Sequence, residues 1–140
     1  MKVHEIIKCK GSEVHTIDPQ SPVSEVVQLL VKYNCGSLVV TSGDKMVGII
    51  TERDILKTCA FEDRTLDDVR VEDRMTQDVI TGSPDEEVSE VMGLMTRHRI
   101  RHLPILDMGQ LCGLISIGDV VKAQHDHLSL ENHYLKSYLL

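Results

Sequence analysis

The chain has 140 residues, a formal net charge of −7 and few aromatic side chains: one Phe, three Tyr and no Trp. This length suits one ordinary domain or two very small ones. The scarcity of aromatic rings argues against a protein that stacks single-stranded bases, and the acidic balance argues against nonspecific duplex binding, so no nucleic-acid partner is expected.

The chain also lacks the features of a secreted or membrane protein. Its longest stretch without a charged side chain is about a dozen residues, whereas a membrane span needs about 20. The amino terminus has no apolar core of the kind found in secretory signals. The four cysteines are far apart in the sequence, with no Cys-x-x-Cys pair, so no metal site is expected. These features predict a reduced, cytoplasmic protein that does not enter a membrane.

The sequence contains an internal duplication. A shift of 65 residues aligns segment 13–57 with segment 78–122 without a gap, and about 13 of the 45 aligned pairs are identical. Random pairing would give roughly a quarter of that number. We therefore expect the same local structure twice.

Each copy begins with a short extended segment, residues 14–17 or 79–81, followed by a helix. The apolar residues of that helix recur at positions i, i+3, i+4 and i+7, which predicts one buried stripe. They are Val23, Val26, Val27 and Leu30 in the first copy and Val88, Val91, Met92 and Met95 in the second. In the second copy, Ser83, Pro84 and Glu86 predict the start of the helix, as an N-cap, a first-turn proline and a capping-box acid.

Two strands and a second helix follow in each copy. The strands cover residues 37–41 and 46–51, joined by a turn at 42–44, and then 103–106 and 111–116, joined by 107–110. The second helices begin near Asp54 and Asp119, so the pattern is β-α-β-β-α twice. Beyond the second copy, residues 128–140 have leucines and tyrosines at near-helical spacing. They predict an amphipathic helix that packs on its own module, on a dimer mate or on a partner.

Matching signatures lie where the last strand of each copy meets its last helix. Each has a glycine, two apolar residues, a hydroxyl and, three residues further on, an aspartate, in the segments 48–54 and 113–119. The spacing of the hydroxyl and the aspartate is that of a capping box, which needs no ligand. The same helix amino terminus can also receive an anion while the aspartate accepts hydrogen bonds from sugar hydroxyls. Both interpretations can hold together.

Basic residues distinguish the two copies. The second copy has Arg97, His98, Arg99, Arg101 and His102 within six residues, and the corresponding stretch of the first copy has only one cationic residue. This cluster predicts a local anion site, although a solvated turn after a helix would also favour cations. The first signature contains Arg53, whereas the second has Gly118 at that position. The two sites are therefore expected to be unequal.

Together, the duplicated pattern, the paired signatures, the Cys35–Val40 turn and the run from Arg99 to Ile105 resemble the cystathionine β-synthase (CBS) domain, present as a tandem pair. The resemblance covers about residues 14–123. It implies an α/β (α+β) fold in which two β-α-β-β-α repeats pack sheet to sheet as a pseudo-twofold Bateman module, and modules that pair as homodimers. On this basis we expect an N-terminal segment packing on the module at 1–12, repeats at 13–70 and 71–125, and a C-terminal tail at 126–140.

The resemblance also implies ligand-binding residues. Asp54 and Asp119 would hold the ribose hydroxyls, Thr51 and Ser116 would donate to phosphate or ribose, and Thr16 and Thr81 would border the base and sugar. Backbone groups near Ser37 and His102 would read the adenine edge, and apolar residues would enclose the ring. The full set of expected ligand-binding residues is Thr16, Ser37, Thr51, Arg53, Asp54, Thr81, Arg99, Arg101, His102, Pro104, Ser116 and Asp119.

The expected function is that of a non-catalytic sensor, because no nucleophile triad, phosphate-binding loop or dinucleotide motif is present. The resemblance implies an adenosine nucleotide as ligand, with AMP first and ATP, ADP or NAD as further candidates, and no required cofactor. Binding would signal energy or cofactor status to a regulated protein that the sequence does not identify. The alternatives are a structural or protein-interaction dimer with vestigial sites, and an S-adenosylmethionine sensor.

Overall fold

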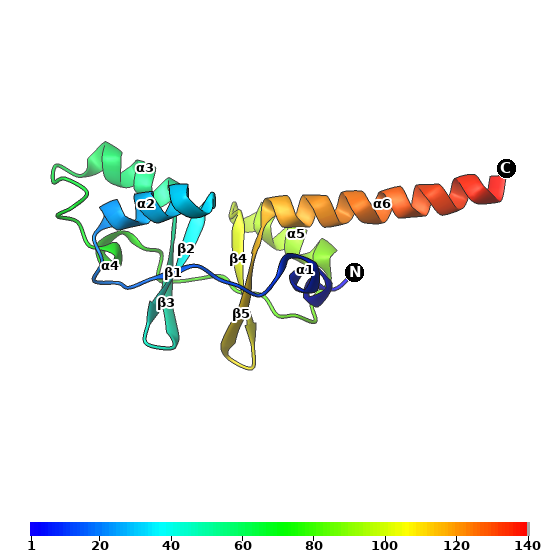
Figure 1. Cartoon of the computed structure of the whole chain (residues 1–140), viewed down its shortest axis with the longest axis horizontal. Coiled ribbons are helices and arrows are strands. Elements are labelled where there is room, and N and C mark those ends of the chain that lie inside the picture. The colour runs from blue at the N-terminus through cyan, green and yellow to red at the C-terminus, as the bar shows by residue number, and fades with distance from the viewer. Residues whose placement is uncertain (140) are drawn as a thin grey trace. The chain divides into compact units, whose positions relative to one another are not determined.

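The computed structural model describes residues 1–139, which form two compact units (Figure 1). The first-copy unit consists of residues 14–80. The second-copy unit consists of residues 1–13 together with the chain from residue 81 onward. The amino-terminal segment therefore belongs to the unit built from the second copy.

The first-copy unit contains a three-stranded sheet with the order β1-β2-β3. Strand β1 (Thr16–Ile17) is parallel to β2 (Ser37–Ser42), and β2 is antiparallel to β3 (Lys45–Thr51). Helix α2 (Val23–Tyr33) connects β1 to β2, and α3 (Glu52–Phe61) and the short α4 (Val71–Arg74) follow β3. The strands predicted at 37–41 and 46–51 and the turn between them are confirmed to within one residue at their ends, and β1 covers only the last two residues of the extended segment predicted at 14–17.

The predicted stripe of α2 forms part of the core of this unit. Val23 and Val26 are fully buried, Leu30 is nearly so, and Val27 is half-buried. The core cluster joins α2 to the sheet and to α4 through Ile17, Val26, Leu30, Leu38, Val40, Ile50 and Val71. Because burying one such side chain contributes about 1.5–3 kcal/mol, this cluster holds the helix and the sheet together.

The second-copy unit contains a two-stranded antiparallel sheet made of β4 (His102–Asp107) and β5 (Gln110–Ser116). Three helices accompany it: α1 (Val3–Lys10), α5 (Val88–His98) and α6 (Ile117–Leu139). Of the predicted stripe of α5, Val88, Val91 and Met95 are buried and Met92 is half-buried. Both copies therefore have an α/β (α+β) fold, and the predicted class is confirmed.

Two details of the second copy were predicted wrongly. Residues 79–81 do not form a strand, because only Gly82 bridges to Ile105 before the chain turns. The helix also does not begin at Ser83, since α5 starts at Val88. Carbonyl oxygens of Pro84 and Glu86 accept hydrogen bonds from the first amides of α1, and this pairing keeps residues 84–86 out of the helix.

Helix α6 is longer than expected, because the second helix of the copy and the predicted tail form one helix of 23 residues (Figure 1). The helical prediction for 128–139 is confirmed, and Leu140 lies outside the described residues. Every residue from 128 to 139 is exposed, so this part of α6 does not pack on its own unit. No helix within residues 1–139 combines the length and the apolar character that crossing a membrane requires.

Helices α1 and α4 occupy the same place in the two units, as their backbone hydrogen bonds show. Val71 N donates to Ser21 O at 2.9 Å in the first-copy unit, and Val3 N donates to Glu86 O at 3.0 Å in the second. The side chain four residues after each of these amides also takes the same position in the two units. Met75 packs on Gly48 of β3, and Ile7 packs on Gly113 of β5. Helix α4, which precedes the second copy in the sequence, thus covers the sheet of the first copy. Helix α1, which precedes the first copy, covers the sheet of the second.

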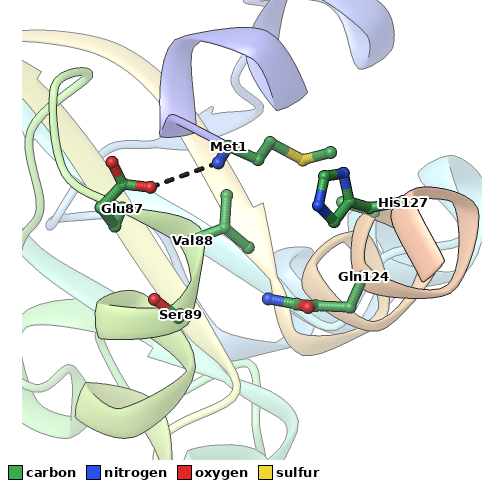
Figure 2. A pocket seen from close by; sticks show the side chains of 7 residues that line it. Met1, Glu87, Val88, Ser89, Gln124 and His127 are labelled. Carbon is green, nitrogen blue, oxygen red and sulfur yellow. Dashed lines mark hydrogen bonds and ion pairs between the residues drawn. The ribbon is translucent and has the colours of Figure 1, made fainter. Parts of the chain in front are cut away.

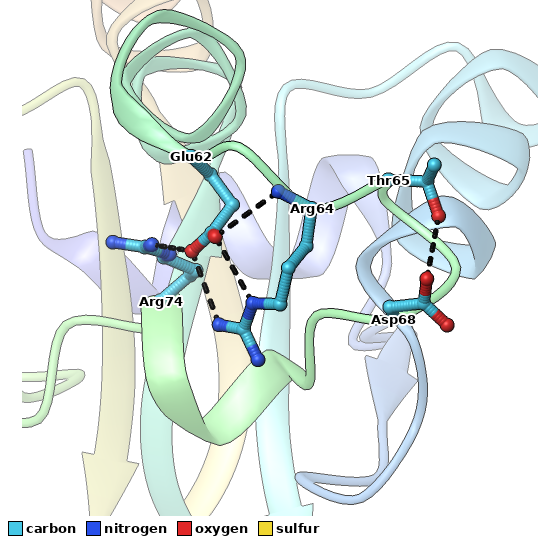
Figure 3. Close-up of polar contacts among 5 residues, drawn as sticks. All are labelled: Glu62, Arg64, Thr65, Asp68 and Arg74. Atoms are coloured by element: carbon cyan, nitrogen blue, oxygen red, sulfur yellow. Dashed lines mark hydrogen bonds and ion pairs between the residues drawn. The ribbon is translucent and has the colours of Figure 1, made fainter.

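The loop between α3 and α4 is closed by an ionic cluster (Figure 3). Glu62 accepts hydrogen bonds from the Arg64 side chain at 3.0 and 3.1 Å, and it also pairs with Arg74. The Arg64 side chain and backbone, followed by Arg74, lower the pKa of Glu62 to about 2. This cluster ties the end of α3 to α4 and so holds the α3–α4 loop in place.

Candidate functional site

The first signature forms a reciprocal capping box at the start of α3. Asp54 N donates to Thr51 Oγ1 at 3.4 Å, and Asp54 Oδ2 accepts from Thr51 N at 2.9 Å and from Thr51 Oγ1 at 3.2 Å. A cap of this kind contributes about 1 kcal/mol to a helix. Within the described chain, the Asp54 side chain accepts from Thr51 alone, so Oδ1 is left for another donor.

Ser37 lies beside this signature, because it pairs with Thr51 across strands β2 and β3. Its side chain is buried, with 2% of the residue exposed, and within residues 1–139 the hydroxyl oxygen has no hydrogen-bond partner. Thr16 of β1 is exposed and pairs with Val39, two residues further along β2. Arg53 is exposed on the first turn of α3. The first-copy unit therefore brings Ser37, Thr51 and Asp54 together, with Arg53 adjacent to them in the chain.

The second signature repeats this geometry at the start of α6. Ser116 N donates to Asp119 Oδ2 at 2.8 Å, and Asp119 N donates to Ser116 Oγ at 3.1 Å. His102 pairs with Ser116 across β4 and β5, as Ser37 pairs with Thr51 in the other copy. The two signatures are therefore alike in backbone position and in capping bonds.

Lys10 distinguishes the second signature from the first. Its ammonium donates to Asp119 Oδ2 at 2.6 Å and to the carbonyl oxygen of Leu114 at 2.7 Å. Burial alone would raise the pKa of Asp119, but the hydrogen bonds from Lys10 and Ser116 outweigh it, and the pKa lies below its ordinary value. Asp119 is therefore ionised and already paired with a cation.

The remaining expected residues of the second copy surround β4. Pro104 is buried within β4, and its carbonyl oxygen accepts from Gly82 N, next to Thr81. Arg99 ends α5 in the left-handed conformation, with φ 54°, and Arg101 is exposed just before β4. Neither guanidinium forms a salt bridge within residues 1–139. Both remain available to an anion.

Sequence reasoning missed one residue that contacts the second signature, Lys10. No motif surrounds it, and 109 positions separate it from Asp119 in the chain. The only available signal was the predicted packing of the amino-terminal segment on the module, and that prediction does not indicate which residue Lys10 contacts. Its contact with Asp119 depends on how α1 packs on β5 and α6.

A shallow pocket elsewhere in the second-copy unit offers less chemistry (Figure 2). It lies between the start of α1, the start of α5 and one face of α6, and it is lined by Met1, Glu87, Val88, Ser89, Ala123, Gln124 and His127. The amino group of Met1 already pairs with Glu87 at 3.2 Å. Among the described residues, no three His, Cys, Asp or Glu side chains gather as metal ligands would.

The two signatures share one chemical capability. Each places a carboxylate, a hydroxyl and the amino terminus of a helix within a few residues. The carboxylate accepts hydrogen bonds from hydroxyl groups, whereas the helix terminus and any nearby guanidinium favour an anion. A ligand that carries both vicinal hydroxyls and a phosphate matches this combination.

Comparison with known proteins identifies the same family that the sequence motifs resemble. The family model of the CBS domain matches residues 4–60 and 67–126. The CBS domain-containing protein CBSX3, mitochondrial, of Arabidopsis thaliana is 36% identical over 137 residues, an alignment that covers 89% of this chain and 66% of that protein. The chain thus spans about two thirds of the length of that relative.

Solved structures agree with this match. A structure described as a signal-transduction protein with CBS domains from Burkholderia ambifaria is 40% identical, with a TM-score of 0.85 over 88% of this chain and 93% of the other. The CBS domain pair of protein MJ0100, solved with 5-methylthioadenosine and S-adenosyl-L-methionine, is 28% identical, with a TM-score of 0.77 over 88% of this chain and 98% of that one.

Proposed function

The chain belongs to the CBS domain family, and on that premise we propose that it is a regulatory module that binds an adenosine-containing ligand through its two signatures. The observation that carries the proposal is the pair of matching capping boxes, Thr51 with Asp54 and Ser116 with Asp119. Each leaves the second carboxylate oxygen without a partner among the described residues. That oxygen can accept a ribose hydroxyl while the box still caps its helix.

The surrounding residues would bind the rest of the ligand. Thr51 and Ser116 would donate to ribose or phosphate once their hydroxyls turn from the cap. Arg53 in the first copy, and Arg99 and Arg101 in the second, would provide the cations for a phosphate group. Thr16, Thr81, Ser37, His102 and Pro104 would border the base and the sugar. The buried and unpaired hydroxyl of Ser37 supports this role, because such a group gains most from a polar partner.

Among adenosine ligands, AMP is our first choice, with ATP, ADP and NAD as further candidates. The guanidinium groups of Arg99 and Arg101, which form no salt bridge within residues 1–139, support a phosphorylated ligand. S-adenosylmethionine is the alternative, supported by the MJ0100 structure, whose ligands have no phosphate. The affinity ranking of these ligands decides between the two kinds of sensor.

The proposed output is a change in affinity for a regulated protein. Such a change requires that the ligand bind one conformation of the module more tightly than another. A homodimer, a cytoplasmic location and a non-catalytic role belong to the same proposal. The division into an amino-terminal segment (1–12), two repeats (13–70 and 71–125) and a tail (126–140) also stays a prediction.

A protein-interaction dimer is the second candidate function. It is favoured by the exposed apolar side chains along α6, among them Leu128, Leu135 and Leu139, with exposed fractions of 56%, 61% and 86%. Apolar groups left in water on one helix are typical of a surface that meets another protein. This role and ligand sensing are compatible if the two signatures still bind.

Isothermal titration of AMP, ATP, NAD and S-adenosylmethionine into nucleotide-stripped protein tests the proposal. We expect micromolar binding of at least one ligand. Asp54→Ala and Asp119→Ala should each weaken binding at its own signature, by about tenfold or more, because each removes the carboxylate of that signature and leaves the other signature intact.

The matched control is Asp67→Ala, which removes an exposed carboxylate outside both signatures. Its affinities should equal those of the natural sequence. A folded protein that binds none of the four ligands would refute the adenosine proposal and favour the protein-interaction role.

A further inference from the structure

Helix α1 delivers a cation to one signature only. Val3 and Ile6 of α1 are buried, Ile7 packs on Gly113 of β5, and Lys10 at the end of the helix contacts Asp119. The Lys10 ammonium also donates to Leu114 O, so two of its three N–H groups are used within the unit. The contact between Lys10 and Asp119 is therefore part of a packed arrangement.

The equivalent segment of the first-copy unit has no such contact. Helix α4 ends at Arg74, and the chain then pairs Thr76 with Ile49 of β3 through hydrogen bonds of 2.8 and 3.0 Å. Arg74 itself pairs with Glu62. Asp54 is thus left with Thr51 as its partner, while Asp119 has both Ser116 and Lys10.

This difference changes what each carboxylate offers to a diol. A carboxylate binds two vicinal hydroxyls best when both oxygens are free to accept and the group keeps its negative charge. In both signatures Oδ2 already accepts two hydrogen bonds, from Thr51 N and Thr51 Oγ1 at Asp54, and from Ser116 N at 2.8 Å and the Lys10 ammonium at 2.6 Å at Asp119. The two carboxylates differ because one donor to Asp119 is a cation. The ammonium also neutralises the charge that strengthens a hydrogen bond from a neutral hydroxyl.

We propose that the Lys10 ammonium competes with the ribose diol for Asp119. This competition weakens ribose binding at the second signature, so the first signature binds ligand before the second does. The inference rests on the proposed function, because it concerns the same two signatures. It assigns a specificity-determining role to Lys10, which lies outside the duplicated segment. For a diol hydroxyl to reach Oδ2 of Asp119, it must displace a charged donor, whereas Oδ2 of Asp54 accepts only from the neutral groups of Thr51.

Titration of adenosine into full-length protein tests this role, because adenosine has the diol and no phosphate. The experiment uses the Asp54→Ala background, in which the second signature alone remains intact. Adding Lys10→Met should tighten adenosine binding about fivefold, the effect expected from removing one partly exposed ion pair. The gain should be smaller for 2′-deoxyadenosine, which lacks one of the two hydroxyls.

The matched control is Lys8→Met, which removes an exposed lysine of the same helix and should leave the affinity unchanged. Adding Asp119→Asn should abolish the gain from Lys10→Met. Circular dichroism checks that each variant is folded. A gain with Lys10→Met, no change with Lys8→Met and loss of the gain with Asp119→Asn would together support the competitor role.

Other outcomes separate the two proposals. If the natural sequence binds adenosine or AMP but Lys10→Met brings no gain, or weakens binding, the competitor role is overturned and the sensor function stands. An equal gain for 2′-deoxyadenosine overturns it too, because the diol would then not be the group that Lys10 displaces. If no variant binds adenosine or AMP, both proposals fail.

Discussion

At the residue scale, Glu62 should make the stability of the fold depend on pH. Its pKa is about 2 in the folded chain, against an ordinary value of 4.5, because Arg64 and Arg74 stabilise the charged form. The contribution of this group is fully present above pH 4.5. It is lost as pH falls from about 4.5 to 2, since the unfolded chain takes up the proton first.

Urea denaturation of the natural sequence and of Glu62→Gln checks this expectation. The natural sequence should have the larger free energy of unfolding at pH 6, and the difference should shrink steadily toward pH 2.5. Asp67→Asn is the control, because Asp67 is exposed and forms no ion pair within residues 1–139. A difference for Glu62→Gln that stays constant from pH 6 to pH 2.5 would contradict the proposed role of the ion pairs.

Residue spacing alone predicted the capping boxes at Thr51 and Ser116, and both are present. This success follows from local geometry, because a hydroxyl and a carboxylate three residues apart meet at the first turn of any helix. The ion pair between Glu62 and Arg74 was not predicted. It joins residues on either side of a loop, and the path of a loop depends on what the rest of the chain packs against.

At the element scale, the paired glycines Gly48 and Gly113 should respond differently to alanine. A Cβ at Gly48 would lie 2.9 Å from the Thr76 carbonyl oxygen and 2.7 Å from Met75 Sδ, whereas one at Gly113 would meet only the Ile7 side chain, at 2.9 Å. Since a backbone atom cannot move aside as a side chain can, Gly48→Ala should cost about 2 kcal/mol and Gly113→Ala about 1 or less.

Chemical denaturation of both variants gives the two costs, and Gly93→Ala is the internal control. Gly93 lies in α5 with nothing within 4 Å of an added Cβ, so alanine there should stabilise the protein by about 0.5–1 kcal/mol. An equal cost at Gly48 and Gly113 would mean that α4 and α1 do not cover their sheets in the way described here.

Elements with strong periodicity were predicted correctly, and those that depend on a distant neighbour were not. The stripes of α2 and α5 follow from apolar spacing, which the burial of Val26 and Val91 confirms. The misplaced start of α5 has a tertiary cause. The segment from Ser83 to Glu86 has the composition of a helix start, but its Pro84 and Glu86 carbonyl groups accept hydrogen bonds from the amides of α1.

At the scale of the whole molecule, deleting residues 128–140 should leave the fold intact. Residues 128–139 are exposed throughout, so their removal takes no buried contact from either unit. The free energy of unfolding from urea denaturation should change by less than about 0.5 kcal/mol, and circular dichroism should lose helical signal. A large fall in stability at micromolar concentration would instead show that the end of α6 is buried in an oligomer.

Light scattering of the two forms gives the complementary result. If α6 joins copies of the chain through Leu128, Leu135 and Leu139, the deletion should convert dimer to monomer. An unchanged number of chains per particle would show that any dimer forms through another surface. This test also separates the expected homodimer from the proposed interaction with a different protein.

The amino-acid sequence by itself determined the duplication, the α-β-β-α order that both copies share, the buried stripes and the two capping signatures, because each depends on residues close together in the chain. Tertiary structure decided that α1 covers β5, that α4 covers β3, and that Lys10 meets Asp119. The physical reason is that these contacts join segments up to 109 residues apart, and their partners are chosen by which apolar faces remain to be buried.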